Sequence, residues 1–100
     1  MKRAENAGFK AIVLTIDAPT FGKRLPDLRN KFKLPSHLKM ANFEDLPKSM
    51  NVRERDFSLT WEGITWLKSI TNLPIIVKGV LHPEDAILAI EYGVEGTFLF

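Results

Sequence analysis

Three short apolar runs, separated by amphipathic segments, dominate the pattern of the chain. Residues 11–16 are apolar apart from one threonine and rich in β-branched side chains, residues 74–77 repeat this pattern, and residues 96–100 form a third run. A continuous apolar run of this length, without strict alternation, is typical of a strand buried on both faces of a parallel sheet. The pattern therefore predicts three such strands.

A helix is predicted over residues 61–70, just before the second run. Trp61, Ile64 and Leu67 recur at helical spacing, Trp66 extends their apolar face, and Thr60 precedes them as a candidate N-cap. We expect both tryptophans to be core residues of a helix that packs on the sheet.

A second helix is predicted over residues 83–92. Pro83 suits the first helical position after His82, two acidic residues follow in the first turn, and Gly93 ends the helix. Residues 1–7 are predicted to be the last turns of a further helix, which Gly8 stops. Helices that alternate with strands imply right-handed βαβ crossovers and a parallel sheet, so the predicted fold class is α/β.

Residues 18–58 interrupt this alternation. The segment contains four prolines, few periodic apolar residues and an excess of basic side chains. Loops of this length are uncommon in compact domains and are usually functional. The segment also follows the carboxyl end of the first strand, where barrels and doubly wound folds place their active sites. We therefore expect a long functional loop here.

The composition excludes several classes of protein. The chain has 100 residues, 45% of them hydrophobic, with no cysteine and two histidines, His37 and His82. Disulfide scaffolds and cysteine-ligated metal sites are therefore excluded, and no metal site is predicted. No apolar run approaches the ~20 residues that span a bilayer, so we expect a soluble, intracellular chain without a membrane partner.

The charge is unevenly placed, although the net charge is only +2. Residues 21–39, here named the basic window, contain six Lys or Arg against one Asp and carry +5. A local basic excess suits a phosphate, another anionic ligand or a nucleic acid. Lysines that solvate a loop would produce the same pattern. Composition alone leaves both interpretations open.

Polar side chains at two strand ends are the first candidates for chemistry. Lys78 directly follows the second apolar run, and Thr15 and Asp17, two residues apart, share a face at the end of the first. Lys78 could hold a cofactor phosphate or stabilise an anion, or it could extend its charge to the rim of the sheet. Asp17 could serve a site or form the turn before Pro19.

Arg24 is the candidate anion clamp of the long loop. The planar guanidinium of arginine binds a carboxylate or a phosphate with two parallel hydrogen bonds. Pattern alone does not separate Arg24 from Lys23 or Arg29.

Several stretches of the chain resemble one known family. They are residues 8–19 with the motif Thr15-Ile16-Asp17, residues 22–24, 27–32 and 58–61, residues 73–80 with the motif Val77-Lys78-Gly79, and residues 84–86. In this order and spacing they resemble the FMN-dependent 2-hydroxy-acid oxidases, the glycolate oxidase family. The resemblance spans essentially the whole chain.

The resemblance implies that residues 1–100 are the central fragment of an FMN hydroxy-acid oxidase domain, an incomplete TIM (β/α)8 barrel. The chain would supply the fourth strand, the long loop after it, the fifth strand with its helix, and the start of the sixth strand. A whole barrel typically needs ~250 residues, so the implied barrel is partial.

The resemblance also implies roles for site residues. Thr15 is expected to hydrogen-bond the flavin of FMN, and Lys78 is expected to lie beside its N1 and O2 atoms. Arg24 is expected to bind the substrate carboxylate, and Phe21 is expected to line the substrate pocket. Asp17 matches the aspartate that orients the catalytic histidine of the family.

The implied activity is the oxidation of a small, glycolate-like (S)-2-hydroxy acid to the 2-oxo acid, with reduction of O2 to H2O2. The chain ends before the Ser-Asn-His-Gly segment that supplies the histidine base in the family, so we expect these 100 residues alone to be inactive. The family also implies a homo-oligomer, a tetramer, in the peroxisome. The chain itself carries no targeting signal, and a cytoplasmic location is the other expectation.

Two other hypotheses stay open. The chain could be a non-enzymatic module whose basic window binds an anionic partner. Nucleic acid is not the expected partner, because base stacking needs exposed aromatic side chains among the charges and only Phe21 and Phe32 qualify. The chain could also belong to another flavin- or phosphate-binding barrel, which would have no reason to carry both Asp17 and Arg24 at this spacing.

Overall fold

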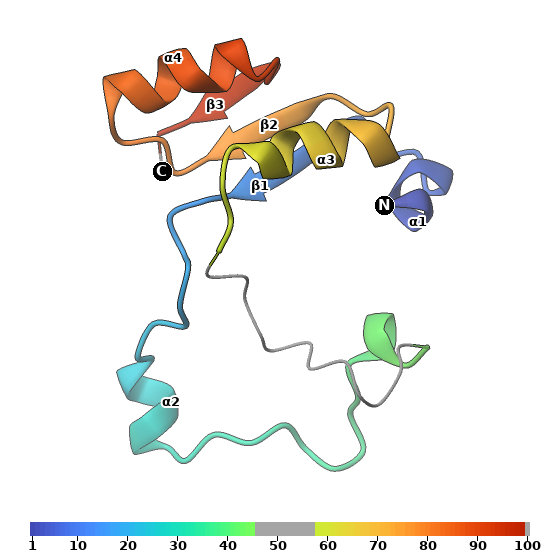
Figure 1. Ribbon diagram of the computed structural model, residues 1–100. Helices are drawn as coiled ribbons and strands as arrows, with labels where there is room; N and C mark the ends of the chain where they lie inside the picture. Colours follow the sequence, from blue (N-terminus) through green and yellow to red (C-terminus); the bar gives the residue numbers. More distant parts are fainter. Residues whose placement is uncertain (46–57, 100) are drawn as a thin grey trace. The chain divides into compact units, whose positions relative to one another are not determined.

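A computed structural model describes residues 1–45 and 58–99 (Figure 1). The chain divides into two compact units, one formed by Met1–Pro19 with Phe57–Phe100 and the other by Thr20–Asp56. Within the described residues, no helix combines the length and the apolar character needed to cross a bilayer.

The first unit contains a three-stranded parallel sheet. Strands β1 (Ile12–Thr15), β2 (Ile75–Lys78) and β3 (Gly96–Phe98) lie in this order, and both neighbouring pairs are parallel. Helix α1 (Lys2–Asn6) precedes β1, helix α3 (Glu62–Ile70) precedes β2, and helix α4 (Pro83–Glu91) connects β2 to β3. The predicted α/β fold with three parallel strands is confirmed.

The core of this unit lies on one face of the sheet. Ile75 and Val77 of β2 are fully buried and pack with Ile64 and Leu67 of α3 and with Val80. Partly buried apolar side chains of β1, α4 and the residues that flank the helices and strands pack against this cluster. Because residues two apart in a strand share a face, α3 and α4 both cover the face that carries Ile75 and Val77 (Figure 1).

The other face of the sheet is uncovered in the described residues, which corrects one expectation. Val13 of β1 is 49% exposed and Phe98 of β3 is 53% exposed, and burial alternates along β1. The prediction that the first strand is buried on both faces is therefore wrong for the described chain. The physical reason is that helices pack on one face only.

Two expectations for α3 are also wrong. The helix begins after Trp61 rather than after Thr60, and no side chain makes a capping hydrogen bond there. Trp66 is largely exposed, because it lies about 200° around the helix from Ile64, which faces the core. Trp61 does pack against the core, and its ring stacks on that of Tyr92 with 5.9 Å between centroids.

The ends of α4 and α1 agree with the sequence signals. His82 is the N-cap of α4 and Pro83 its first residue. Gly93 follows α4 with a φ of +75°, a left-handed conformation that glycine adopts without strain. Gly8 follows α1 in the same way, with a φ of +80°.

The second unit is less irregular than predicted. It contains a short helix, α2 (Leu25–Arg29), and a 3₁₀ turn, η1 (Ala41–Phe43). Pro26 is compatible with α2 because the first N–H groups of a helix have no partner within it. Residues 46–57 of the predicted loop lie outside the described residues.

Candidate functional site

Two of the predicted site residues pair across neighbouring strands. Thr15 is the last residue of β1, Lys78 is the last residue of β2, and their Cα atoms are register partners. Register partners in a sheet present their side chains on the same face, here the face opposite α3 and α4. The strand ends therefore bring a hydroxyl and an ammonium group together.

Asp17 joins this pair through its carboxylate. Its Oδ1 atom lies 3.7 Å from Nζ of Lys78, and the two side chains are 33% and 38% exposed. An ion pair so open to water contributes about 1 kcal/mol or less to stability, so its importance lies in where it places charge. The pair places both charges at one strand end, an arrangement that a functional site shares with a rim lysine beside a turn aspartate.

Gly79 lies against Asp17 at this strand end. Its φ is +99°, and a Cβ atom added to it would lie 2.5 Å from Cγ of Asp17. The Gly79 N–H donates a 2.9 Å hydrogen bond to the carbonyl of Phe98, and the Ile16 N–H donates one of 2.9 Å to the carbonyl of Lys78. The sequence analysis did not identify Gly79 as a site residue. The only pattern that could have pointed to it is its position directly after Lys78.

The uncovered face combines apolar side chains with this polar end. Val13 and Phe98 are half-exposed on it, Ile76 is partly buried, and Thr15 and Lys78 lie where the strands end. A flavin is a planar, largely apolar ring system with a polar edge. These residues fit FMN, because Lys78 offers a cation and Thr15 a hydroxyl beside an apolar surface.

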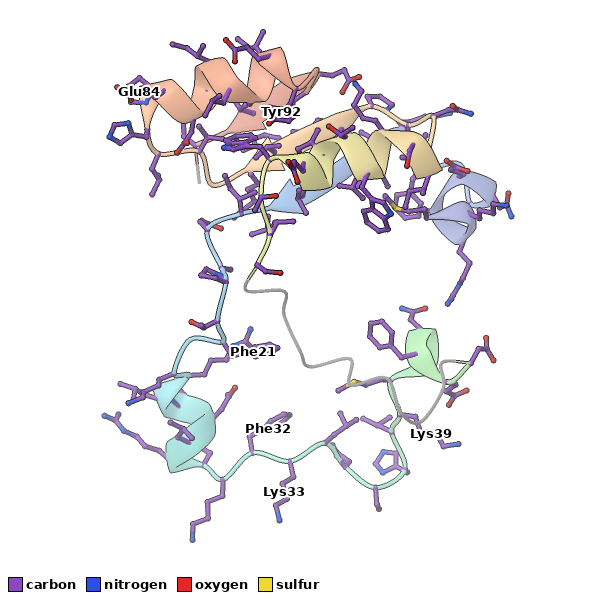
Figure 2. All side chains as sticks on the ribbon, viewed as in Figure 1. Phe21, Phe32, Lys33, Lys39, Glu84 and Tyr92 are labelled. Carbon is purple, nitrogen blue, oxygen red and sulfur yellow. The ribbon has the colours of Figure 1, made fainter. Side chains whose placement is uncertain are left out.

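The second unit contains an open cavity of about 770 Å³, whose lining residues are all exposed to solvent. Two predicted site residues, Arg24 and Phe21, line it (Figure 2). Met40 and Phe43 line it as well, although no sequence pattern pointed to them. The other lining residues are Gly22, Lys23, Asp27 and Leu28. Arg29 is not among them but Lys23 is, so the cavity separates Arg24 from Arg29 and leaves Arg24 and Lys23 together as candidates for the anion clamp.

The basic window is open to solvent. Phe32 is 66% exposed and stands between Lys31 and Lys33, in the segment that follows α2 (Figure 2). The Lys39 ammonium lies 3.8 Å from a carboxylate oxygen of Glu44. The cations suit an anionic partner, and an exposed aromatic side chain between two of them is what base stacking by a nucleic acid would need.

A second charged cluster lies at the opposite end of β2, where sequence reasoning identified nothing. The Glu95 carboxylate accepts a 2.8 Å hydrogen bond from the Ile75 N–H, and its other oxygen lies 3.3 Å from Nζ of Lys68. Lys68 also donates to the Gly93 carbonyl. The Ile75 N–H, and after it Lys68, hold the pKa of Glu95 below its ordinary value. This cluster ties α3 and the turn after α4 to the start of β2.

No metal centre accompanies these sites in the part of the chain that the structure describes. Those residues contain no group of three or more His, Cys, Asp or Glu arranged to hold a metal ion. The His82 Nδ1 atom instead pairs with the neighbouring Glu84 carboxylate at the start of α4, and both side chains are largely exposed.

Comparison with known proteins finds relatives over almost the whole chain. The model of a family described as FMN-dependent dehydrogenase matches residues 1–99. The chain is 50% identical to glycolate oxidase 3 of Arabidopsis thaliana, over 99% of this chain and 30% of the relative. It is 45% identical to 2-hydroxyacid oxidase 1 of Mus musculus, over 99% of this chain and 31% of the relative. The chain thus spans about three-tenths of the length of these curated relatives.

Solved structures of related proteins agree with this result. A mandelate oxidase variant with (S)-mandelic acid is 41% identical and superposes with a TM-score of 0.77, over 96% of this chain and 26% of that chain. The three parallel strands therefore match part of a mandelate oxidase structure. Because the family model matches residues 1–99 and the mandelate oxidase structure superposes on nearly the same residues, the chain belongs to the FMN-dependent dehydrogenase family.

Proposed function

We propose that the chain forms the central part of an FMN-dependent (S)-2-hydroxy-acid oxidase, with β1, β2 and β3 as the fourth to sixth strands of a (β/α)8 barrel. Helices on one face of a parallel sheet support this, because barrel strands carry helices outside and turn the other face to the barrel interior. The observation that carries the functional proposal is the gathering of Thr15, Asp17 and Lys78 at adjoining strand ends.

In this proposal Thr15 and Lys78 hold FMN, on which the family depends. Bound FMN supplies a two-electron acceptor that O2 can reoxidise. The Lys78 ammonium stabilises negative charge at the polar edge of the flavin, and the Thr15 hydroxyl orients that edge by a hydrogen bond.

The proposed substrate is a small 2-hydroxy acid, a class supported by the names of the relatives, glycolate oxidase and 2-hydroxyacid oxidase. Arg24 binds the substrate carboxylate with two hydrogen bonds, and Phe21 lines the pocket. Asp17 orients a histidine base that takes the hydroxyl proton and comes from a part of the enzyme outside these residues. The hydroxy acid loses two electrons and two protons to become the 2-oxo acid, and O2 accepts them to become H2O2.

The proposal extends to a homo-tetramer in the peroxisome. Light scattering of the whole enzyme tests the tetramer, and co-localisation with a peroxisomal marker tests the location. A monomer in the first measurement, or a cytoplasmic signal in the second, removes that part of the proposal alone.

A chimera tests the assignment of function. Residues 1–99 of the chain replace the aligned segment of Arabidopsis thaliana glycolate oxidase 3, to which they are 50% identical. If the residues of this chain perform the proposed roles, the chimera retains FMN and releases H2O2 from glycolate. A folded chimera that retains no FMN contradicts the proposal.

Lys78→Met in the chimera removes the ammonium and keeps a long, flexible side chain. We expect FMN to bind about 10-fold more weakly or worse, because a hydrogen bond to a charged group is worth about 1.5–3 kcal/mol. Lys10→Met is the matched control, because Lys10 is exposed and precedes the opposite end of β1. Equal FMN affinity for the chimera and its Lys78→Met variant, measured by flavin fluorescence, would rule out the role given to Lys78.

The basic window supports a second candidate function, a non-enzymatic module that binds an anionic partner. The supporting observation is Phe32, which is exposed between Lys31 and Lys33. Titration of the chain with single-stranded nucleic acid separates the two functions. Salt-dependent binding that Phe32→Ala weakens favours a module that binds nucleic acid, and absence of binding at low salt removes nucleic acid as its partner.

A further inference from the structure

The ion pair between Asp17 and Lys78 joins two residues that the proposed function uses for different purposes. Lys78 acts on the cofactor and Asp17 acts on a histidine, yet Oδ1 and Nζ are 3.7 Å apart. A carboxylate at this distance offsets part of the ammonium charge that an anionic ligand would meet. A residue that determines the position of the Asp17 carboxylate therefore also influences how much positive charge an anionic ligand meets at Lys78.

Gly79 is the residue that leaves room for this carboxylate. A Cβ atom at position 79 would lie 2.5 Å from Cγ, 2.6 Å from Cβ and 2.8 Å from Oδ1 of Asp17. Cβ atoms do not approach other heavy atoms so closely, so an added methyl group must displace part of the structure.

The backbone around Gly79 is the part least able to move. Gly79 is buried, and its N–H donates a 2.9 Å hydrogen bond to the Phe98 carbonyl of β3. On the other side, the Ile16 N–H donates a 2.9 Å hydrogen bond to the carbonyl of Lys78. The Asp17 side chain, in contrast, is 33% exposed, so rotation can carry its Cγ and Oδ1 toward solvent, while the 2.6 Å contact with its Cβ requires the Asp17 backbone to shift as well. A side chain at position 79 therefore displaces the carboxylate.

We propose that Gly79 is a positioning residue: its lack of a side chain lets the Asp17 carboxylate lie beside the Lys78 ammonium and so limits the positive charge that Lys78 presents to an anionic ligand. The identity of that ligand rests on the proposed function, which makes it the polar edge of FMN. A larger residue at position 79 pushes the carboxylate away and leaves more charge on Lys78. The reduction potential of bound FMN then rises, because negative charge on the flavin is better stabilised.

The steric part is tested in the full chain by a double-mutant cycle on thermal unfolding. Gly79→Ala lowers Tm, and Asp17→Gly, which removes the obstructing atoms, restores most of that loss in the double variant. Gly8→Ala is the matched control, since Gly8 also has a positive φ, +80°, but nothing lies within 4 Å of the added Cβ. It lowers Tm less, and Asp17→Gly does not restore its loss. Additive effects of Gly79→Ala and Asp17→Gly overturn the steric link.

The electrostatic part is tested by the reduction potential of FMN in the chimera. Asp17→Asn and Gly79→Ala each raise the potential, because both take the carboxylate charge away from Lys78, and Gly8→Ala leaves it unchanged. Adding Lys78→Met to either variant abolishes the rise. A purely structural role of Gly79 would not move the potential. An unchanged value in a Gly79→Ala chimera that retains FMN therefore overturns the inference.

Failure of the proposed function gives a different result. The chimera itself then retains no FMN, and the double-mutant cycle in the chain still decides whether Gly79 positions Asp17. If Gly79→Ala alone does not fold, the double variant with Asp17→Gly folds when the steric link is correct. A double variant that also fails to fold overturns it.

Discussion

Arg24 and its neighbour Lys23 differ from the other cations of the basic window, because both line the cavity of the second unit. Arg24 stands at the N-cap of α2 with an extended backbone, and it lines the cavity together with Phe21 and Phe43. A guanidinium on the wall of a cavity can bind a carboxylate with two parallel hydrogen bonds, which an ammonium cannot. The shape of the side chain at this position should therefore matter as much as its charge.

Arg24→Lys in the chimera keeps the charge and removes the planar fork. We expect the KM for glycolate to rise about 10-fold or more while FMN affinity stays unchanged, because the lost hydrogen bonds are to the substrate. Arg29→Lys is the same substitution outside the cavity and should change KM by less than about twofold. Steady-state rates of H2O2 release give both values. An equal rise in the two variants argues against Arg24 as the clamp.

Glu95 is expected to make the stability of the folded chain depend on pH. The Ile75 N–H, followed by Lys68, stabilises its charged form, so its pKa in the folded chain lies below the ordinary 4.5. A carboxyl group with a lowered folded pKa stabilises the fold above its ordinary pKa and loses that contribution as the pH falls through the folded value. We therefore expect part of the acid sensitivity of Tm, below pH 4.5, to come from Glu95.

Glu95→Gln isolates this effect, because it keeps an acceptor for the Ile75 N–H but has no charge to lose. The difference in Tm between the chain and the variant should be largest near neutral pH and should shrink as the pH falls below 4.5. Glu91→Gln, at an exposed position of α4, serves as the control and should give a smaller difference. A difference for Glu95→Gln that does not change with pH would remove the electrostatic explanation.

The strands and helices were predictable because each carries its pattern in its own residues. Their surroundings were not. Val13 and Ile75 belong to similar apolar runs, yet Val13 is half-exposed and Ile75 is fully buried, since helices pack on one face of the sheet. Trp66 shows the same limit in α3, where it joins the apolar residues in sequence but turns away from the core. Periodicity predicts elements, and the layer that covers each face depends on segments far away in sequence.

Ile75→Ala and Val13→Ala should separate these two environments. Ile75 loses buried contacts and leaves a cavity in the core, so we expect a loss of about 2–5 kcal/mol in the free energy of unfolding. Val13 lies on the uncovered face, and its replacement should cost less than about 1 kcal/mol in the chain. Urea denaturation followed by tryptophan fluorescence reports both values through Trp61, which packs on the core. Similar losses for the two variants would mean that the open face is covered in solution.

At the scale of the whole molecule, the sequence predicts which site residues lie close together. It does not predict the contacts that position them. Thr15, Asp17 and Lys78 lie at the carboxyl ends of two apolar runs, and the carboxyl ends of parallel strands meet at one edge of a sheet, so their proximity follows from topology. The contact between Gly79 and Asp17 depends on a backbone angle that no residue pattern encodes. Met40 likewise lines the cavity only through the local fold of the second unit.

Asp17 has a carboxylate that can orient a histidine base. In the described residues, however, its ion-pair partner is Lys78 and not an imidazole. The histidines of the chain are His37 and His82, and the His82 ring pairs with Glu84. A positioned base contributes about 10²–10⁴-fold to the rate, so we expect the 100-residue chain with FMN to release no more H2O2 from glycolate than FMN alone. A peroxidase-coupled assay measures this, with the chimera as the positive control. Turnover by the chain alone that Asp17→Asn abolishes would mean that the base lies within these residues.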